Sequence, residues 1–489
     1  MNKNKQPTKN LFDLTVNKIL FDDDIKTLDV FTPFAHTPWS MWLDSCETKH
    51  IDCRFDILVF EPLLTLSTFG EHTQVTALHE KTLSIINASH TGEVKTFQED
   101  PLSLVDQLSK RIFGDVVTKH QTLPFIGGAL GYFAYDLGRQ FEKVPTKAKQ
   151  DISLADMAVG LYHQAIIFDK NAQCYWLVCP ENERITLEKT IHARVKNTLS
   201  LHTSENSENF TLSSEWQSNM CKASYAEKFD KVQDYLLSGD CYQINLAQRF
   251  QAQYQGDEFD AYKSLRKENK APFSGFIRLK DSTVLSLSPE RFLQTSEGYV
   301  QSKPIKGTMP RSTELKEDTF NAEQLKASTK DRAENLMIVD LLRNDMSKVC
   351  IAGSVKVPKL FEIESFPAVH HLVSTVEGVL SPDKQATDLL RGAFPGGSIT
   401  GAPKIRAMQI IEELEPHRRS IYCGSIGYIS RCGTMDSSIT IRTLVCEKQK
   451  QTIYCWAGGG LVADSNVDSE YQETFDKVQR ILPVLTGKK

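Results

Sequence analysis

Residues 301–313 read QSKPIKGTMPRST, and this segment organises the rest of the chain. It is rich in turn residues and follows a strand-like run at residues 281–293. It places Lys306 directly before Gly307 and two residues after Pro304. Proline fixes φ and glycine allows close approach of another segment, so the lysine is predicted to be stiffly held. Most lysines in turns are solvated surface residues, so Lys306 is a candidate nucleophile that needs support from the rest of the chain.

The composition indicates a large globular protein. Of its 489 residues, 40% are hydrophobic and 9% are aromatic, which suffices for an extensive core. Lysine and arginine number 57 against 62 acidic residues, and the net charge of -5 provides no basic surface for nucleic acid or membrane. The chain shows neither a secretory signal nor an apolar run of about 20 residues. A cytoplasmic protein that acts on a small molecule is therefore predicted.

The cysteine pattern argues against disulfides and zinc. Eleven cysteines are scattered singly, without a C-x-x-C pair, which favours reduced and buried thiols. A nucleophilic role for Cys241 or Cys423 stays open, because a histidine partner need not be near in sequence.

The pattern of elements predicts a mixed α/β fold. Runs of β-branched and aromatic residues predict strands in a β-rich N-terminal part, at residues 54–62, 82–86 and 165–178. The polar stretch 200–218 is the predicted internal boundary, dividing the chain into residues 1–205 and 220–489. Beyond it, strands and helices alternate irregularly rather than as βαβ units. Large, mainly antiparallel sheets with surrounding helices are therefore expected.

Two predicted helices place carboxylates on apolar faces. In residues 331–343, Glu334 shares a helical face with three apolar side chains. In residues 469–482, Glu470 and Glu473 align with apolar residues further along the helix. A buried carboxylate must be paired, hydrogen-bonded or used for function. A salt bridge is the ordinary explanation for either helix, but together the acids predict a magnesium site.

Six motifs follow one another along the chain: PIKGT, DRAENLMIVDLLRND, HHLVSTVEG, GSITGAPKIRAM, DSSITIRT and EYQETFDK. In this order they resemble the chorismate-utilising enzymes, which comprise anthranilate synthase large subunits, aminodeoxychorismate synthase component I, and isochorismate and salicylate synthases. The resemblance covers residues 220–485 and extends weakly to GGALGYFAYD and RFDILVFEP. It implies the chorismate-utilising enzyme fold, with residues 220–489 as the chorismate-binding catalytic domain. Residues 1–205 would resemble the N-terminal domain of anthranilate synthase component I.

The resemblance implies how the acids would act. Glu334 and Glu473 resemble ligands of a magnesium ion that holds the ring carboxylate of chorismate, and Glu470 resembles a supporting acid of that site. Glu290, in the motif SPERF, resembles the acid that protonates the departing 4-hydroxyl group. The role of Glu290 rests on the resemblance alone.

The resemblance also implies a set of substrate contacts. Arg442 and Gly460 resemble binders of the side-chain carboxylate of chorismate. The other implied contacts are Ser398 and His371 at the ring, with a catalytic part for His371, and Gly307, Thr308 and Gln243 among the substrate-binding residues.

Two positions distinguish the branches of the family. Isochorismate-forming relatives carry a lysine base where this chain has Gln243, which disfavours water addition. Anthranilate synthases usually read PIAGT where this chain reads PIKGT, so Lys306 resembles a covalent nucleophile of the aminodeoxychorismate-forming branch. The resemblance thus implies conversion of chorismate and ammonia to 4-amino-4-deoxychorismate, for 4-aminobenzoate and folate synthesis. Anthranilate synthesis and a non-catalytic tryptophan-binding role are the alternatives.

The resemblance further implies a partner and a second ligand. No glutamine-hydrolysing module is recognisable, so a separate glutamine amidotransferase subunit would supply the ammonia. Four N-terminal residues resemble the tryptophan pocket of the family: Asp44, Ser45, Arg54 and Phe55. Asp44 replaces the glutamate that is common there. Tryptophan is a feedback ligand in anthranilate synthases and can be structural in aminodeoxychorismate synthases.

Overall fold

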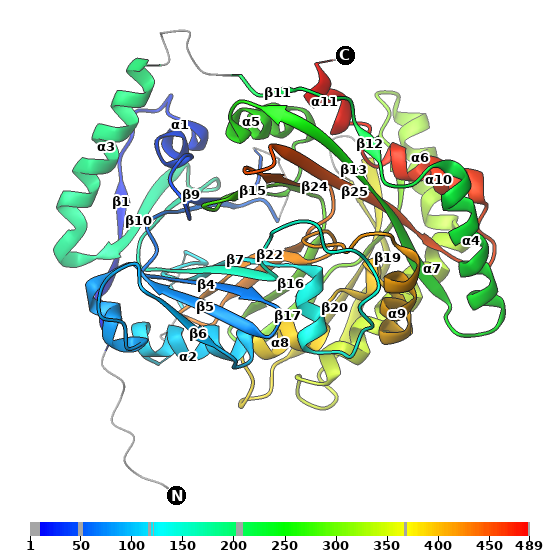
Figure 1. Cartoon of the computed structure of the whole chain (residues 1–489), viewed down its shortest axis with the longest axis horizontal. Helices are drawn as coiled ribbons and strands as arrows, with labels where there is room; N and C mark the ends of the chain where they lie inside the picture. The colour runs from blue at the N-terminus through cyan, green and yellow to red at the C-terminus, as the bar shows by residue number, and fades with distance from the viewer. Residues whose placement is uncertain are drawn as a thin grey trace, which may run out of the picture.

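The structure is a computed structural model that describes residues 10–46, 52–115, 119–120, 122–201, 209–365 and 369–487. Two large sheets lie one above the other, with helices around them (Figure 1). The largest apolar cluster joins side chains of both sheets, for example Val59 and Leu66. The named strands pair antiparallel throughout these ranges, so the predicted mixed α/β fold with antiparallel sheets is confirmed.

The first sheet has 13 strands among the described residues. Its path runs β1 (Leu14–Ile19), β10 (Cys174–Pro180), β9 (Ala165–Asp169), β3 (Phe55–Val59), β2 (Met41–Asp44), β14 (Phe273–Arg278), β15 (Ser282–Ser288), β24 (Thr443–Glu447), β25 (Thr452–Leu461), β13 (Gln243–Gln255) and β11 (Thr211–Leu212). Two short strands also pair with β13, namely β12 (Gln217–Ser218) and β21 (Gly401–Ala402).

The second sheet has 12 strands in the same part of the chain. Its path runs β18 (Ile305–Pro310), β20 (Val369–Val379), β17 (Tyr299–Ser302), β16 (Arg291–Ser296), β23 (Met435–Ile439), β22 (Ser425–Ser430), β7 (Gly128–Phe133), β8 (Met157–Tyr162), β4 (Leu64–Phe69), β5 (His72–Ala77) and β6 (Val94–Phe97). A further strand, β19 (Lys356–Ser365), pairs with β20.

Both sheets combine strands from the two predicted regions. In the first sheet β2 pairs with β14, and in the second β7 pairs with β22. Residues 1–205 and 220–489 therefore share their sheets, and the boundary between them stays a prediction. Part of the predicted linker, residues 202–208, lies outside the described residues.

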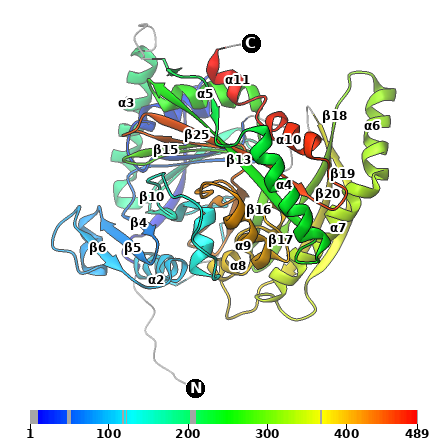
Figure 2. The ribbon, with the colours of Figure 1, turned by 45° about the vertical axis from the view of Figure 1, so that its right-hand side comes forward.

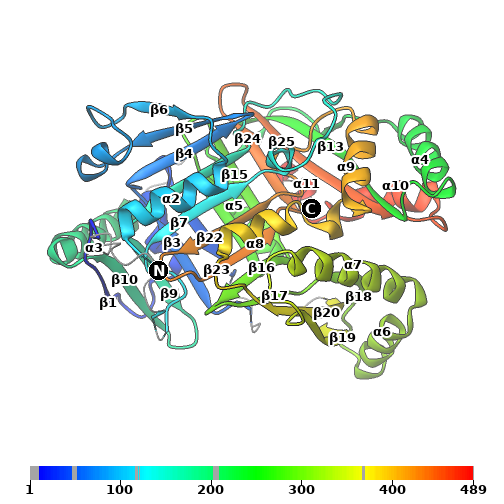
Figure 3. The same cartoon turned by 90° about the horizontal axis from the view of Figure 1, so that it is seen from below.

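Helices pack around the sheets. They are α1 (Thr27–Phe31), α2 (Pro101–Phe113), α3 (Arg184–Leu201), α4 (Lys222–Leu237), α5 (Glu258–Asn269), α6 (Leu315–Ala327), α7 (Thr329–Ser347), α8 (Ala386–Ala393), α9 (Lys404–Leu414), α10 (Val467–Asp476) and α11 (Leu482–Thr486). Seen from below, α2, α8 and α7 follow one another across the second sheet (Figure 3). On another side α4 packs against α10 (Figure 2). Across the described ranges, none of the helices combines the length and apolar character needed to span a bilayer.

Two local predictions were wrong. Of residues 82–86, predicted as a strand, the first four belong to the 3-10 helix η2 (Glu80–Ile85), and Ile86 is its C-cap. The helix is capped at its start by the side chain of His79, which accepts from the Lys81 N–H. The helix predicted at residues 469–482 stops at α10, and α11 is a separate short helix with Pro483 in its first turn. Residues 477–481 form turns between the two helices.

Candidate active site

A cavity of about 610 Å³ gathers almost all of the residues predicted for catalysis, substrate binding and metal binding. Those that line it are Glu290, Lys306, Gly307, Thr308, Glu334, His371, Ser398, Arg442, Gly460, Glu470 and Glu473. They come from segments far apart in sequence, including β18, β20, β25, α7 and α10. The fold therefore brings together side chains that the sequence separates by up to about 180 positions.

A β-bulge holds the lysine at this cavity. Gly307 is the extra residue where β18 pairs with β20, between Lys306 and Thr308. Its φ is +72°, and a Cβ atom there would lie 2.7 Å from Leu325 Cδ1 and 2.8 Å from Asp331 Cγ. A side chain at this position would meet both a strained backbone and two neighbours. The close contacts at Gly307 come from side chains of α6 and α7 rather than from backbone.

Lys306 is a largely buried amine next to a carboxylate. Its Nζ atom lies 3.8 Å from Oε2 of Glu334, and the two side chains are 14% and 16% exposed. Burial lowers the pKa of Lys306, while the negative charges of Glu334 and Glu290 act in the opposite direction. A lowered pKa enlarges the fraction of neutral amine, which is the nucleophilic form.

Glu290 has the properties of a proton donor. Its side chain is buried, and Oε1 accepts a hydrogen bond from Ser398 Oγ at 3.4 Å. Burial raises the pKa of Glu290 to about 7, against the opposing effects of Lys306, the backbone N–H of Ile305 and Ser398. A carboxyl group with this pKa is partly protonated at neutral pH and can both give and take a proton.

His371 is fixed by its neighbour on β18. Its Nδ1 atom lies 2.9 Å from Oγ1 of Thr308, across the β18–β20 pairing. The histidine side chain is buried at the cavity wall. The contact with Thr308 sets the orientation of the ring toward the site.

Two acids that line the cavity, Glu334 and Glu470, have carboxylates that are only partly stabilised by hydrogen bonds and positive charges. Oε1 of Glu470 accepts from Ser465 Oγ at 2.7 Å, whereas its buried Oε2 has no hydrogen-bond partner within the described ranges. Burial raises the pKa of both Glu334 and Glu470, and the neighbouring charge of Glu473 adds to the shift. The nearby lysines Lys306, Lys330 and Lys477 oppose these shifts but do not outweigh burial.

Glu473 differs from the prediction of a buried acid. Its side chain is 45% exposed and forms an ion pair with Lys477 Nζ at 2.6 Å. Lys477 is the residue directly after α10, and it also donates to the Gly458 carbonyl at 2.7 Å. Glu473 therefore lines the cavity as a partly exposed acid rather than as a core residue.

The acids suit a hard cation that would take part of its ligands from the substrate. Among the described residues, no three His, Cys, Asp or Glu side chains converge closely enough to hold a metal ion by themselves. Glu334, Glu470 and Glu473 nevertheless line one cavity, and an oxygen of Glu470 lacks a partner. Mg²⁺ fits this donor set, because it commonly binds one or two carboxylates and takes its other ligands from water and substrate oxygens.

Gln243 does not line the cavity, in contrast to its predicted place among the substrate-binding residues. It lies behind Gly460 of β25, where an added Cβ atom would come within 2.0 Å of Gln243 Nε2. The Gln243 side chain is fully buried, and its amide atoms have no hydrogen-bond partner within the described part of the chain. Arg442, by contrast, lines the cavity, and burial together with nearby Arg480 lowers the pKa of its guanidinium.

Several lining residues were missed by the sequence analysis. Tyr422 and Trp456 form an aromatic wall, with ring centroids 6.3 Å apart and an interplanar angle of 6°. Asn245 and Lys477 also line the cavity. The spacing of four residues between Glu473 and Lys477 could have indicated their ion pair. Tyr422, Trp456 and Asn245 carry no local signal, because only the sheet pairing brings them to the site.

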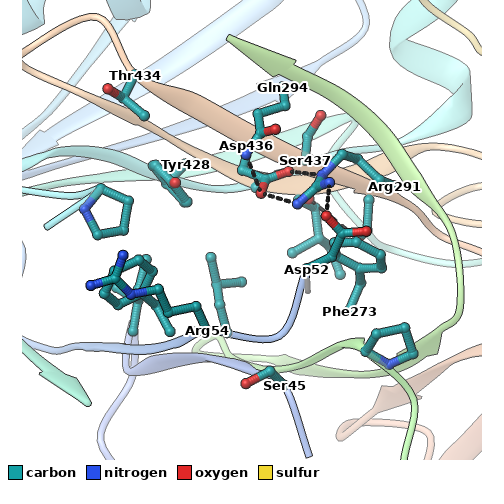
Figure 4. A pocket seen from close by; sticks show the side chains of 18 of the residues that line it. Ser45, Asp52, Arg54, Phe273, Arg291, Gln294, Tyr428, Thr434, Asp436 and Ser437 are labelled. Atoms are coloured by element: carbon teal, nitrogen blue, oxygen red, sulfur yellow. Dashed lines mark hydrogen bonds and ion pairs between the residues drawn. The ribbon is translucent and has the colours of Figure 1, made fainter. Parts of the chain in front are cut away.

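A second cavity, of about 430 Å³, is lined by all four residues predicted for a tryptophan pocket (Figure 4). Arg291 lies on one side, held between Asp436 at 2.9 Å and Asp52 at 2.5 Å. Asp44 is already engaged, because Oδ2 accepts from Arg266 Nε at 2.6 Å and from the Tyr262 hydroxyl at 2.9 Å. The cavity combines aromatic walls with several charged groups.

Comparisons with known proteins show the family to which the chain belongs. A family model described as chorismate binding enzyme matches residues 54–483. Aminodeoxychorismate synthase component 1 of Escherichia coli (strain K12) is 52% identical over 459 residues, covering 93% of this chain and 95% of that protein. The protein of the same name from Klebsiella aerogenes is 52% identical over 453 residues, with 92% and 95% covered. The crystal structure of anthranilate synthase component I from Streptococcus pneumoniae TIGR4 superposes with a TM-score of 0.74 at 30% identity, with 89% and 93% covered.

Proposed function

Because the chain belongs to the chorismate-binding enzyme family, we propose that it converts chorismate and ammonia into 4-amino-4-deoxychorismate, on the way to 4-aminobenzoate and folate. Relatives named aminodeoxychorismate synthase component 1, which are about half identical over most of the chain, support this reaction. The observation that carries the proposal is Lys306, a buried amine with a lowered pKa that shares its cavity with Glu290.

In the first step the neutral Nζ of Lys306 attacks C2 of chorismate. Both ring double bonds shift, the C4–O bond breaks, and Glu290 donates the proton that lets the hydroxyl group leave as water. The pKa of Glu290 at about 7 keeps that proton available near neutrality. The product of the step is a covalent adduct between C2 and the lysine nitrogen.

In the second step ammonia attacks C4 of the adduct. Both ring double bonds shift back, and the bond between C2 and Lys306 breaks to release the free amine. The carboxylate of Glu290 formed in the first step can accept a proton from the attacking nitrogen. The two displacements together replace the hydroxyl group with an amino group on the same carbon and release one water.

The remaining groups of the cavity orient the substrate. Arg442 would pair with the side-chain carboxylate, and Tyr422 and Trp456 wall the cavity. A magnesium ion held by Glu334, Glu470 and Glu473 would bind the ring carboxylate and offset the negative charge there.

A separate glutamine amidotransferase would supply the ammonia. The name component 1 of the relatives indicates a second component in those proteins. Ammonia is largely protonated at neutral pH and is then not nucleophilic, so direct delivery from a docked partner favours the second step. With ammonium salt in excess, the chain alone should nevertheless turn over.

One assay tests the reaction. The purified chain, given chorismate, Mg²⁺ and ammonium salt, is expected to form a product that yields 4-aminobenzoate only after a 4-amino-4-deoxychorismate lyase is added. Chelation of the metal with EDTA is expected to stop the reaction, and added Mg²⁺ should restore it. Fluorescent anthranilate appearing without the lyase would identify the alternative activity, and unaltered chorismate would exclude both.

We also propose that the second cavity binds tryptophan. Its volume of about 430 Å³ accommodates an amino acid with a bicyclic ring, and Phe55 and Phe273 offer apolar contacts to the ring. Arg54 is positioned over the face of Phe55, with its guanidinium carbon 4.6 Å from the ring centroid. The charged groups around the cavity can pair with the amino and carboxylate groups of the ligand.

Tryptophan is expected to raise the thermal stability of the chain. A ligand at 100 times its Kd stabilises the folded state by about 2.7 kcal/mol, which corresponds to a shift of a few degrees in Tm. The measurement is a thermal unfolding scan with tryptophan, and with phenylalanine for comparison. The variant Phe55→Ala should lose the shift. A Tm that tryptophan does not change would contradict the assignment.

A further inference from the structure

A third cavity, of about 360 Å³, lies at one end of the second sheet, away from the two described above. Its walls come from α2, the start of α8, the β16–β17 turn and the β22–β23 turn. Figure 3 shows α2 beside α8 on the outside of this sheet. The residues that line it line neither of the other two cavities.

The charges around this cavity do not balance locally. Lys110, Lys384 and Arg431 contribute positive charge, whereas Asp106 and Glu297 contribute negative charge. Asp106 is paired with Lys110 at 3.0 Å. Glu297 lies 3.9 Å from a lysine outside the cavity, Lys119. Each acid of the lining therefore has its own lysine, and Arg431 is left without a counter-ion from the lining.

Arg431 is a half-buried cation with two buried nitrogens that lack a partner. Its Nε and Nη1 atoms are inaccessible to solvent and make no hydrogen bond within the described ranges. Burial lowers the pKa of this guanidinium, and Asp13 acts on it only at longer range. The hydroxyl group of Thr295, which also lines the cavity, is buried and unpartnered as well. Buried hydrogen-bond donors without a partner are costly, so these groups are suited to an anion that enters the cavity.

The rest of the wall is largely apolar. Val105 and Phe113 contribute from α2, Leu380 from the end of β20, Ala386 from α8 and Ile429 from β22. A bare inorganic ion would leave this apolar surface without contacts. An organic anion would instead place its charged group on Arg431 and bury its apolar part against α2.

We propose that this cavity is a binding site for a small organic monocarboxylate with an apolar body, and that Arg431 holds its carboxylate. The site is separate from the cavity that Lys306 lines, and this proposal does not depend on the proposed reaction. Ser109 of α2 stands in the lining and provides a position at which the cavity can be filled.

Benzoate is the probe for the test, with titration calorimetry on the full chain at saturating tryptophan. The variant Arg431→Gln should weaken benzoate binding by about tenfold or more, because a charge-assisted contact is lost. Arg431→Lys should retain part of the affinity. Inorganic phosphate should bind more weakly than benzoate, because it cannot use the apolar wall.

Filling the cavity provides an independent test that leaves the arginine in place. Ser109→Phe should abolish benzoate binding, whereas Ser103→Phe, on the exposed side of the same helix, should leave it unchanged. Far-UV circular dichroism and Tm report whether each variant is folded. Benzoate affinity that is the same in the wild type, Arg431→Gln and Ser109→Phe would overturn the proposal, as would the absence of binding to the wild type.

Discussion

Replacement of Lys306 with alanine is expected to abolish the amination of chorismate, with a loss in kcat of at least about a thousandfold. The amine is buried 3.8 Å from Glu334 and has a lowered pKa, so it is prepared for covalent attack rather than for solvation. Removing it eliminates the adduct, and ammonia would then have to displace the hydroxyl group directly. The measurement is steady-state turnover of chorismate with ammonium salt.

Two further variants show whether activity depends on the nucleophilic amine of Lys306 or only on its positive charge. Lys306→Arg keeps the positive charge near Glu334 but offers a guanidinium that stays protonated, so it should be as inactive as the alanine variant. Lys316→Ala, on the exposed face of α6, is the matched control and should turn over normally. In the wild type without ammonia, mass spectrometry should find the chain increased by chorismate less one water. An alanine variant with normal turnover would refute the nucleophile.

The part of the site that rests on local periodicity could be predicted from the sequence. The apolar spacing around Glu334 predicts a helix, and the structure forms α7 there with Glu334 at the cavity. The unusual backbone at Gly307 could likewise be predicted from the local sequence, because proline and glycine affect the backbone conformation at their own positions. In both cases the relevant interaction is encoded within a few residues.

The rest of the site depends on strand pairing over long distances. Glu290 stands between β15 and β16, and its carbonyl accepts from the N–H of Ile439, about 150 residues away. Strands β15 and β16 are nearly continuously buried, so alternation of polar and apolar residues does not show which face reaches the cavity. Glu290 and His371 could therefore be identified only through resemblance to a family.

Two side chains lie at other depths than predicted. Glu473 was predicted on a buried face, whereas its side chain is 45% exposed and pairs with Lys477. Gln243 was placed at the substrate, whereas Gly460 on the neighbouring strand separates it from the cavity. Helix ends and the depth of a side chain behind a paired strand are decided by tertiary packing.

Replacement of Glu290 with glutamine is expected to slow adduct formation by about a hundredfold or more at pH 6, the contribution of a well-placed general acid. The carboxyl group must be protonated to give its proton to the leaving hydroxyl group. Burial raises the pKa of Glu290 to about 7, so the active, protonated form predominates below that pH and is lost above it. The amide of glutamine can donate a hydrogen bond but not a proton.

The ratio of the wild-type rate to the Glu290→Gln rate reports this ionisation. Lys306 must lose a proton in both proteins, and because the charge of Glu290 raises the pKa of Lys306, ionised Glu290 in the wild type also reduces the fraction of neutral amine. The ratio should be highest below pH 7 and fall at least about tenfold per pH unit above it. Single-turnover measurements from pH 6 to pH 9 provide the data, with Glu323→Gln on the exposed face of α6 as the control. A ratio that stays constant over this range would show that Glu290 is not the proton donor, and the leaving hydroxyl group would then have to be protonated by another group of the cavity.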